Sequence, residues 1–179
     1  MKTYRTISAK AEGLYKDKGS RFLAFAEPVN SLADVQRLLD EYRRRYHDAR
    51  HCCYAYVLGA DGAEWRANDD GEPSGTAGRP ILGQIHSFGL TQVLVVVVRY
   101  FGGILLGTGG LIVAYKEATA DALSRADIVE RVVTERQELT FGYEEMDRVM
   151  RALRQRGARI INQDYTPEGR CKITAEVPL

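Results

Sequence analysis

The amino-acid sequence predicts a mixed α+β fold in two parts. Runs of β-branched and aromatic residues bounded by glycine-containing turns predict strands, some of them paired as hairpins. Between these runs, apolar residues recur with helical spacing. The pattern restarts near Asp127, so we expect an N-terminal domain over residues 1–127 and a smaller C-terminal domain over residues 128–179.

Composition and charge indicate a folded protein without a strong overall electrostatic field. The chain has 179 residues, of which 45% are hydrophobic and 27% are charged. This mixture is typical of globular proteins rather than disordered chains. The chain has 25 basic and 24 acidic residues, so the formal charge is only +1. A nucleic acid would therefore have to bind at a local patch.

Three features of the sequence predict a cytoplasmic location. The three cysteines cannot all pair with one another, and residues 1–5 lack the apolar stretch of a signal peptide. The longest apolar run, Val93 to Val98, is much shorter than the roughly 20 residues that cross a bilayer. We therefore expect no membrane partner.

In the first part of the chain the patterns predict a hairpin and then a helix. Residues 4–12 and 18–29 read as extended segments joined by the polar turn at residues 16–19. Ser31 stands at an N-cap position with Asp34 three residues later, and an apolar stripe follows. We expect a helix over residues 32–46.

The next segments predict a second hairpin and a short helix. Residues 52–58 are apolar and aromatic, and a turn leads into residues 63–67. Residues 68–78 have the composition of a loop. Pro80 suits the first turn of a helix that continues over residues 81–88.

The order strand, glycine loop, helix follows. Residues 91–100 contain four consecutive valines without alternation, which is typical of a strand covered on both faces, so we expect the central strand here. Residues 102–110 include five glycines, and an alanine-rich helix is expected over residues 111–126.

The C-terminal domain is predicted to have the order βαββ. Residues 129–141 form one extended segment in this interpretation. A helical stripe from Met146 to Leu153 ends at Gly157, and strands are expected over residues 159–165 and 170–177.

The glycine segment can be interpreted in two ways. Because it precedes a helix, free backbone N–H groups could bind an anion there, and the helix dipole would favour negative charge. The glycines do not match either standard nucleotide-binding motif. The alternative is that they only permit a tight turn and close packing of the helix on the sheet.

The acidic loop also leaves alternatives open. Asp69, Asp70 and Glu72 do not have the spacing of a calcium loop, although weak magnesium binding fits them. We favour capping of the next helix by Ser74 or Thr76. The cluster of His47, His51 and two adjacent cysteines does not predict zinc, since neighbouring strand residues face opposite ways. We expect no cofactor and no metal.

Arginines cluster at two places. The cluster at residues 43–45 ends a helix, where cations complement the dipole and are usually solvated. A second cluster surrounds the short helix of the C-terminal domain and is the better candidate for binding a polyanion. The nucleic-acid candidates are Arg148, Arg151, Arg154, Arg156 and Arg159.

The two unusual loops are predicted to lie side by side and to form one anion pocket. Each precedes a helix, and the two positive helix-dipole ends near Arg79 and Arg99 would repel unless an anion or the loop acids lie between them. In the alternative, the acids are the built-in counter-charge and no ligand is needed. The pocket candidates are His51, Asp69, Asp70, Glu72, Ser74, Thr76, Arg79, Arg99, Gly102, Gly103, Gly107, Thr108, Gly109 and Gly110.

Three motifs resemble the YigZ/IMPACT family: HCCYAY at 51–56, DDGEPSGTAGRP at 69–80 and VRYFGGILLGTGGL at 98–111. The resemblance implies an N-terminal domain like ribosomal protein S5 domain 2. It implies a C-terminal domain of ferredoxin-like type, as at the end of elongation factor G. The chain departs from this pattern because the last helix and strand of a ferredoxin-like domain do not follow the third strand.

The resemblance also directs the functional hypotheses. It implies a role near translation, so the leading hypothesis is a non-enzymatic regulator that binds RNA, the ribosome or a translation-related protein. The alternative is an enzyme or sensor for a small phosphorylated or carboxylated ligand at the glycine-rich loops. In that case Arg99 would bind the anion, and Asp70, Glu72 and His51 would supply acid, base or metal-binding groups.

Overall fold

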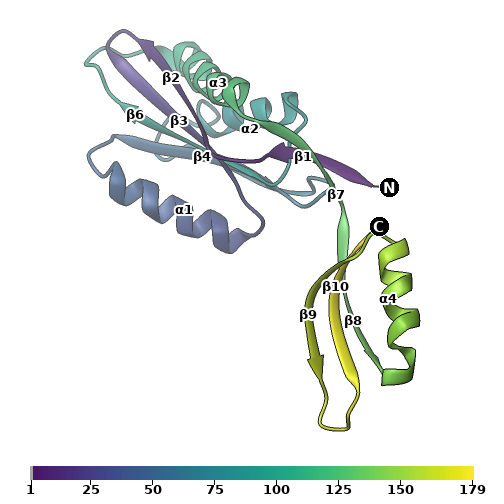
Figure 1. Cartoon of the computed structure of the whole chain (residues 1–179). Coiled ribbons are helices and arrows are strands. Elements are labelled where there is room, and N and C mark those ends of the chain that lie inside the picture. Colours follow the sequence, from purple (N-terminus) through teal and green to yellow (C-terminus); the bar gives the residue numbers. More distant parts are fainter. Residues whose placement is uncertain (1) are drawn as a thin grey trace. The chain divides into compact units, whose positions relative to one another are not determined.

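The structure is a computed structural model that describes residues 2–179. The chain divides into two compact units, each with helices and strands (Figure 1). One unit spans Tyr4–Glu130, and the other comprises Arg131–Leu179 with the first residues of the chain. No helix within residues 2–179 combines the length and the hydropathy needed to cross a membrane.

A five-stranded sheet organises the larger unit. Its spatial order is β2-β3-β6-β4-β5, and all neighbouring strands are antiparallel. The predicted central strand is confirmed, because β6 lies third of five. The strands are β2 (Ala11–Asp17), β3 (Ser20–Pro28), β4 (His51–Leu58), β5 (Glu64–Asn68) and β6 (Val93–Tyr100).

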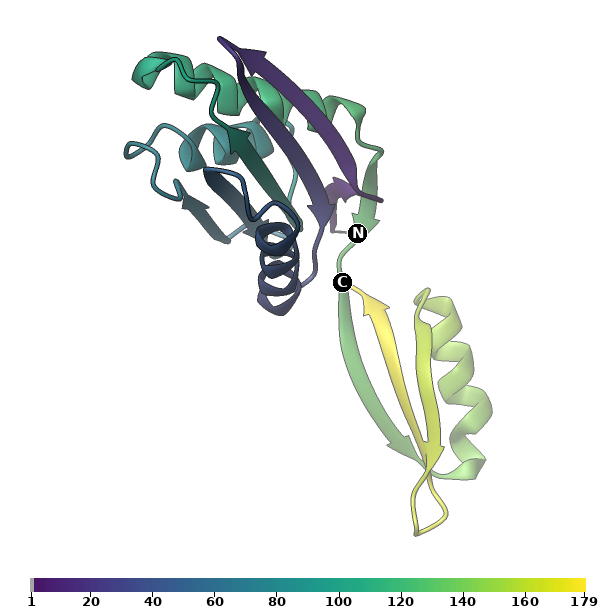
Figure 2. The ribbon, with the colours of Figure 1, turned by 90° about the vertical axis from the view of Figure 1, so that its left-hand side faces the viewer.

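Helices cover both faces of this sheet (Figure 2). Helix α1 (Leu32–Arg45) packs on one face, and α2 (Gly78–Ser87) and α3 (Gly107–Arg125) pack on the other. Alternate residues of β6 enter the two cores, odd-numbered valines toward α2 and α3 and even-numbered residues toward α1. The unbroken apolar run of β6 follows from this burial on both faces.

Most predicted elements of this unit are present, with differences at their ends. The first hairpin turns at residues 17–20, and α1 begins after its N-cap Ser31, whose hydroxyl accepts from the Asp34 N–H. The extended segment predicted at 4–12 is two strands, since β1 (Thr3–Ile7) ends before β2 begins. The predicted start of α3 was wrong by four residues, since the helix begins at Gly107 rather than at residue 111. The sequence did not reveal this first turn because glycine has a low helix propensity.

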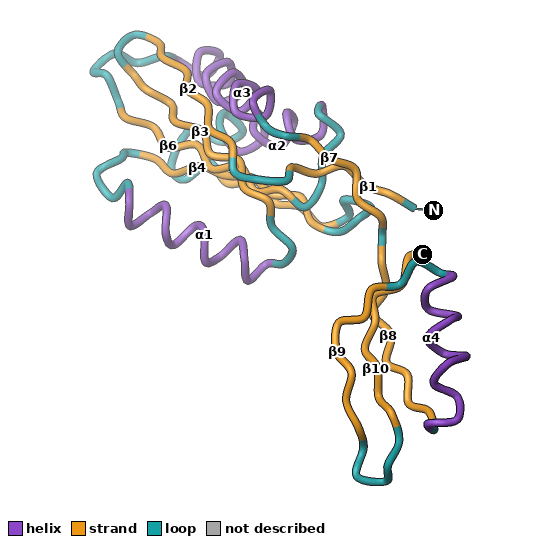
Figure 3. Tube along the Cα trace, in the orientation of Figure 1, coloured by secondary structure: helices purple, strands orange, loops and turns teal. Residues whose placement is uncertain are grey.

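The smaller unit has the predicted βαββ order. The segment predicted at 129–141 is two strands, β7 (Ile128–Val132) and β8 (Thr134–Phe141), and β7 pairs with β1. Figure 3 shows α4 alongside a sheet of order β8-β10-β9. Apolar residues of α4, β8 and β10 form its core. The remaining elements are a short 3₁₀ helix (Tyr143–Glu145), α4 (Met146–Gln155), β9 (Arg159–Tyr165) and β10 (Cys171–Pro178).

Candidate functional site

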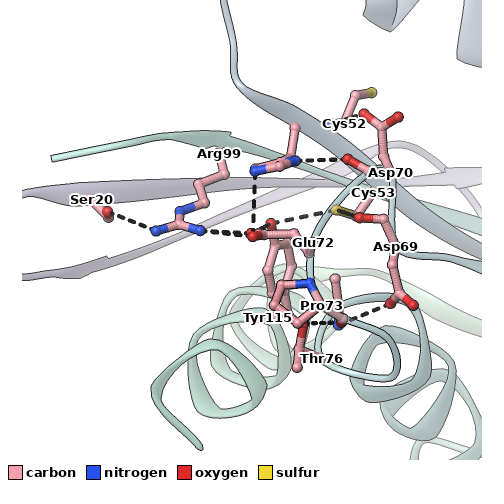
Figure 4. A network of polar contacts seen from close by, with 12 residues as sticks. Ser20, Cys52, Cys53, Asp69, Asp70, Glu72, Pro73, Thr76, Arg99 and Tyr115 are labelled. Atoms are coloured by element: carbon pink, nitrogen blue, oxygen red, sulfur yellow. Dashed lines mark hydrogen bonds and ion pairs between the residues drawn. The ribbon is translucent and has the colours of Figure 1, made fainter. Parts of the chain in front are cut away.

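A buried carboxylate lies at the centre of the polar network in the larger unit (Figure 4). The side chain of Glu72 is 3% exposed, and its two oxygens accept hydrogen bonds of 2.9 and 2.8 Å from Nη1 of Arg99. The Tyr115 hydroxyl donates to Oε2 at 2.5 Å. His51 Nε2 lies 3.4 Å from Oε1. The carboxylate is therefore enclosed by groups of this chain, and Arg99 and Tyr115 are its hydrogen-bond donors.

Arg99 occupies the end of β6 and is 5% exposed. Its guanidinium carbon lies 5.4 Å from the Phe22 ring centre and 5.5 Å from that of Phe101. Its Nη2 donates a long hydrogen bond of 3.5 Å to Ser20 Oγ, and its Nε has no partner within the described residues. The two aromatic rings and the Glu72 carboxylate thus stabilise the guanidinium charge, which water would solvate if the side chain were exposed.

The network contains a thiol and a phenol, and both are held in their neutral forms. Burial raises the pKa of Tyr115 far above its ordinary value, and the neighbouring Cys53 and Glu72 add to the shift. Burial likewise raises the pKa of Cys53 well beyond the usual thiol range. The Cys53 S–H donates to the Asp69 carbonyl oxygen at 3.1 Å. A thiol that stays protonated is a poor nucleophile, so Cys53 contributes packing.

Asp69 organises the loop that carries Glu72. Its carboxylate accepts from the N–H groups of Gly75, Ala77 and Gly78 at 2.9, 3.1 and 2.8 Å. Burial raises the pKa of Asp69, but these donors and the nearby Arg79 outweigh it, and the net pKa lies below the ordinary value. The carboxylate is thus ionised at neutral pH.

The predicted caps of α2 are wrong. The N-cap residue is Ala77, and no side chain of its own caps the helix. The hydroxyl of Thr76 instead donates to the Pro73 carbonyl oxygen, and Ser74 makes no side-chain hydrogen bond within the described residues. Asp69 takes the capping role from eight residues upstream because the loop folds back on itself.

Asp70 joins the loop to His51 and Cys52 at the start of β4. The carboxylate of Asp70 accepts from the Cys52 N–H at 2.7 Å, and its carbonyl oxygen lies 2.7 Å from His51 Nδ1. Asp70 has a φ of +41°, a conformation that aspartate tolerates better than most residues. Within residues 2–179 no three His, Cys, Asp or Glu side chains gather as a metal site.

The structure joins only one end of the glycine segment to this network. The Gly102 N–H donates to Ser20 Oγ at 3.1 Å, and a Cβ on Gly102 would lie 2.1 Å from the Gly19 carbonyl carbon. Glycine is therefore required where two backbones touch. In the described residues, no hydrogen bond or ion pair links residues 69–78 to residues 103–110. The glycine-segment candidates outside the network are Gly103, Gly107, Thr108, Gly109 and Gly110.

These contacts correspond to the alternative in which the loop acids supply the counter-charge and no ligand is needed. Glu72 neutralises Arg99, and Asp69 binds the loop backbone. Tyr115 and Ser20 belong to the network although no sequence pattern singles them out: one lies in a helical apolar stripe and the other at a hairpin turn. Arg79 and Ser74 do not join these contacts and instead line a surface cavity.

The arginines around α4 are all exposed, and they divide into two groups. Arg148 pairs with Glu145 at 2.7 Å and Arg159 pairs with Glu176 at 2.8 Å. The other three have no carboxylate within 4 Å in the described part of the chain. We call these three the α4 arginine surface: Arg151, Arg154 and Arg156.

Comparison with known proteins gives consistent matches. The sequence model of the Impact N-terminal domain matches residues 18–123. The chain is 37% identical over 150 residues to the Escherichia coli (strain K12) protein named IMPACT family member YigZ, which covers 83% of this chain and 74% of that protein. It is 39% identical over 129 residues to IMPACT family member YvyE of Bacillus subtilis (strain 168), covering 72% of this chain and 59% of that protein.

A solved structure supports the whole architecture. A protein described as a hypothetical protein superposes with a TM-score of 0.81 and 33% identity, covering 99% of this chain and 86% of that chain. The match therefore includes both compact units rather than the larger one alone. Together, the match to the Impact N-terminal domain and the identity to curated family members show that the chain belongs to the IMPACT family.

Proposed function

We propose that the protein is a non-enzymatic, translation-associated regulator that acts in the cytoplasm by contacting RNA, on its own or in the ribosome. Membership of the IMPACT family supports the link to translation, since the family resemblance implies such a role. A translation-related protein is the other partner consistent with this role. No cofactor is part of the proposal.

The observation that carries the RNA contact is the α4 arginine surface. Arg151, Arg154 and Arg156 are exposed and lack carboxylate partners in the described chain, so their charges are available to phosphates. Arginine binds phosphate oxygens in a two-pronged geometry that lysine cannot reproduce. Two of these groups lie on α4 and the third at its C-cap, so three unpaired positive charges are close in sequence in a chain whose net charge is only +1.

The polar network supports a role without catalysis. Its carboxylates already bind Arg99 and the loop backbone, and its thiol and phenol remain protonated. The alternative of an enzyme or sensor at the glycine-rich loops would require Arg99 to leave Glu72 and enter solvent. Such a release is costly for a buried pair.

The two units also support a domain assignment. We assign residues 1–127 to a domain like ribosomal protein S5 domain 2, and residues 128–179 to part of a ferredoxin-like domain. The βαββ order, with β10 between β8 and β9, supports the second assignment, since it matches the first part of a ferredoxin-like sheet.

The test is a fluorescence-anisotropy titration with a structured RNA at two salt concentrations. We expect binding at low salt that weakens as salt rises, because counterions are released from the phosphates. The triple variant Arg151→Ala/Arg154→Ala/Arg156→Ala should bind more weakly. Its log–log salt slope should be smaller by about 0.7 to 0.9 for each phosphate group that the variant no longer binds.

The matched control removes three exposed arginines elsewhere. The variant Arg43→Ala/Arg44→Ala/Arg45→Ala loses the same charge from the end of α1 and should keep most of the affinity. Equal losses in the two variants would show that only net charge matters. That outcome, or an absence of binding at low salt, would refute the α4 arginine surface as the RNA contact.

A further inference from the structure

A cavity of about 570 Å³ lies on the outer side of the 69–78 loop, between β5 and α2. Its size falls in the range of roughly 300–1,000 Å³ that is usual for small-molecule sites. The Glu72–Arg99 pair, on what we call the inner side of the loop, does not line the cavity, although Asp69 does. Its lining residues include Trp65, Ser74, Arg79, Leu82, Gly83 and His86.

Two basic side chains from α2 line this cavity. Arg79 and His86 are seven residues apart, which places them on the same side of the helix two turns apart. Neither side chain makes a hydrogen bond or an ion pair with any described residue. Asp69 also lines the cavity, but three backbone N–H groups already occupy its carboxylate. The α2 side of the cavity therefore offers side chains whose hydrogen-bonding groups are unused within the described chain.

Gly83 lies between these two residues and leaves the helix surface bare. A Cβ there would meet no atom within 4 Å, and the residue does not have a positive φ. Neither close packing nor backbone conformation therefore requires glycine. Glycine inside a helix costs about 1 kcal/mol relative to alanine. Its presence is explained if something outside the chain approaches the helix at this point.

Trp65 supplies an aromatic wall. It is the single tryptophan of the chain and is 57% exposed. Its partner in the β4–β5 ladder is Val57, which belongs to the core beneath α2, so Trp65 projects on the α2 side of the sheet. Exposed aromatic rings next to arginine are the usual means of binding a nucleobase together with its phosphate.

We propose that this cavity binds a nucleotide, with the base stacked on Trp65 against the bare helix surface at Gly83. The phosphate binds to Arg79, with His86 and the Ser74 hydroxyl as further donors. A free mononucleotide and one unit of single-stranded RNA present this same chemistry. The site does not depend on the α4 arginine surface, so each can fail without the other.

The test uses the fluorescence of Trp65. We expect saturable quenching when adenosine or uridine monophosphate, or a single-stranded ten-nucleotide RNA, is added to the full chain at low salt. Quenching by the mononucleotides would identify a free nucleotide as the ligand, and quenching by the RNA alone would identify an RNA unit. Ribose 5-phosphate, which lacks the base, should leave the fluorescence unchanged.

Three variants separate a built site from surface stacking. Arg79→Ala should weaken binding about tenfold, the value of one charge-assisted contact. Arg44→Ala, an exposed arginine distant from the cavity lining, should not change it. Gly83→Leu should abolish quenching by filling the helix surface, whereas Gly83→Ala should retain most of it.

The circular-dichroism melting curve of each variant shows that it is folded before binding is compared. The proposal is overturned if neither mononucleotide nor RNA quenches Trp65 saturably up to millimolar concentration. It is also overturned if a folded Arg79→Ala or Gly83→Leu variant binds as the parent chain does. Loss of RNA binding in the α4 triple variant with quenching intact would separate the two surfaces.

Discussion

An arginine lies on each side of the loop at residues 69–78, and the two arginines differ in burial and in ion pairing. On the inner side, Arg99 is 5% exposed and its charge is met by Glu72. On the outer side, Arg79 is exposed beside a cavity and has no ion-pair partner in the described chain. Asp69 lines the same cavity, and its carboxylate binds three N–H groups of the loop backbone.

The difference shows that charge alone does not mark a binding site. An arginine whose donors are used internally stabilises the fold, and an arginine with unused donors can bind a ligand. The inner side should therefore respond to mutation through stability, and the outer side through binding with little change in stability.

The largest expected effect comes from Glu72→Gln. This variant keeps the shape of the side chain but leaves the Arg99 charge buried without a counter-charge, so we expect a loss of about 3–5 kcal/mol in the free energy of unfolding. Urea denaturation measures it. The exposed Glu64→Gln on β5 is the control and should change stability by less than about 0.5 kcal/mol.

The double variant Glu72→Gln/Arg99→Met sharpens this prediction. Because both charges are removed, it should recover much of the stability that the single variant loses. A single variant that is nearly as stable as the parent would show that the pair is not needed to neutralise Arg99.

An intermediate effect is expected at Asp69. Its folded-state pKa is lowered, so its stabilisation is complete above the unfolded value of about 3.9 and is lost as pH falls through the folded pKa. Asp69→Asn should cost about 1.5–3 kcal/mol at pH 7, the usual value for hydrogen bonds to a charged acceptor. The difference between variant and parent should shrink below about pH 4. A difference that does not vary from pH 2 to 7 would contradict this account.

The smallest effect is a gain in stability. Gly83→Ala should raise the free energy of unfolding by about 0.5–1 kcal/mol, since alanine favours the helix and its Cβ meets no neighbour. Thermal melting detects it. A loss of stability would mean that Gly83 has a structural role, and would remove one support of the nucleotide site.

The elements of the fold follow closely from local patterns. Strand β6 and helix α1 each carry their own signal, an unbroken valine run in one and an N-cap with an apolar stripe in the other. The boundaries of other elements were harder to predict, because the signal at a boundary can depend on a single residue. Gly107 starts α3 although glycine normally argues against a helix, and Val133 separates β7 from β8 without any turn residue.

The candidate site could be predicted only in part, because its partners come from distant segments. The sequence indicated that either the loop acids Asp69, Asp70 and Glu72 or a ligand balance Arg99, yet it could not choose between them. Trp65, Gly83 and His86 are residues of different chemical types, and they belong to no recognisable sequence motif. Only the packing of α2 against β5 brings them to one cavity.

The position of β6 in the sheet has a consequence for how the chain folds during synthesis. It pairs with β3 on one side and β4 on the other, so both neighbours leave the ribosome before the strand that joins them. Two-stranded hairpins are only marginally stable alone, and pairing between distant segments is slow. The five-stranded sheet therefore cannot form until the valine strand is inserted between the two hairpins, and the core beneath α2 and α3 is completed only when α3 follows.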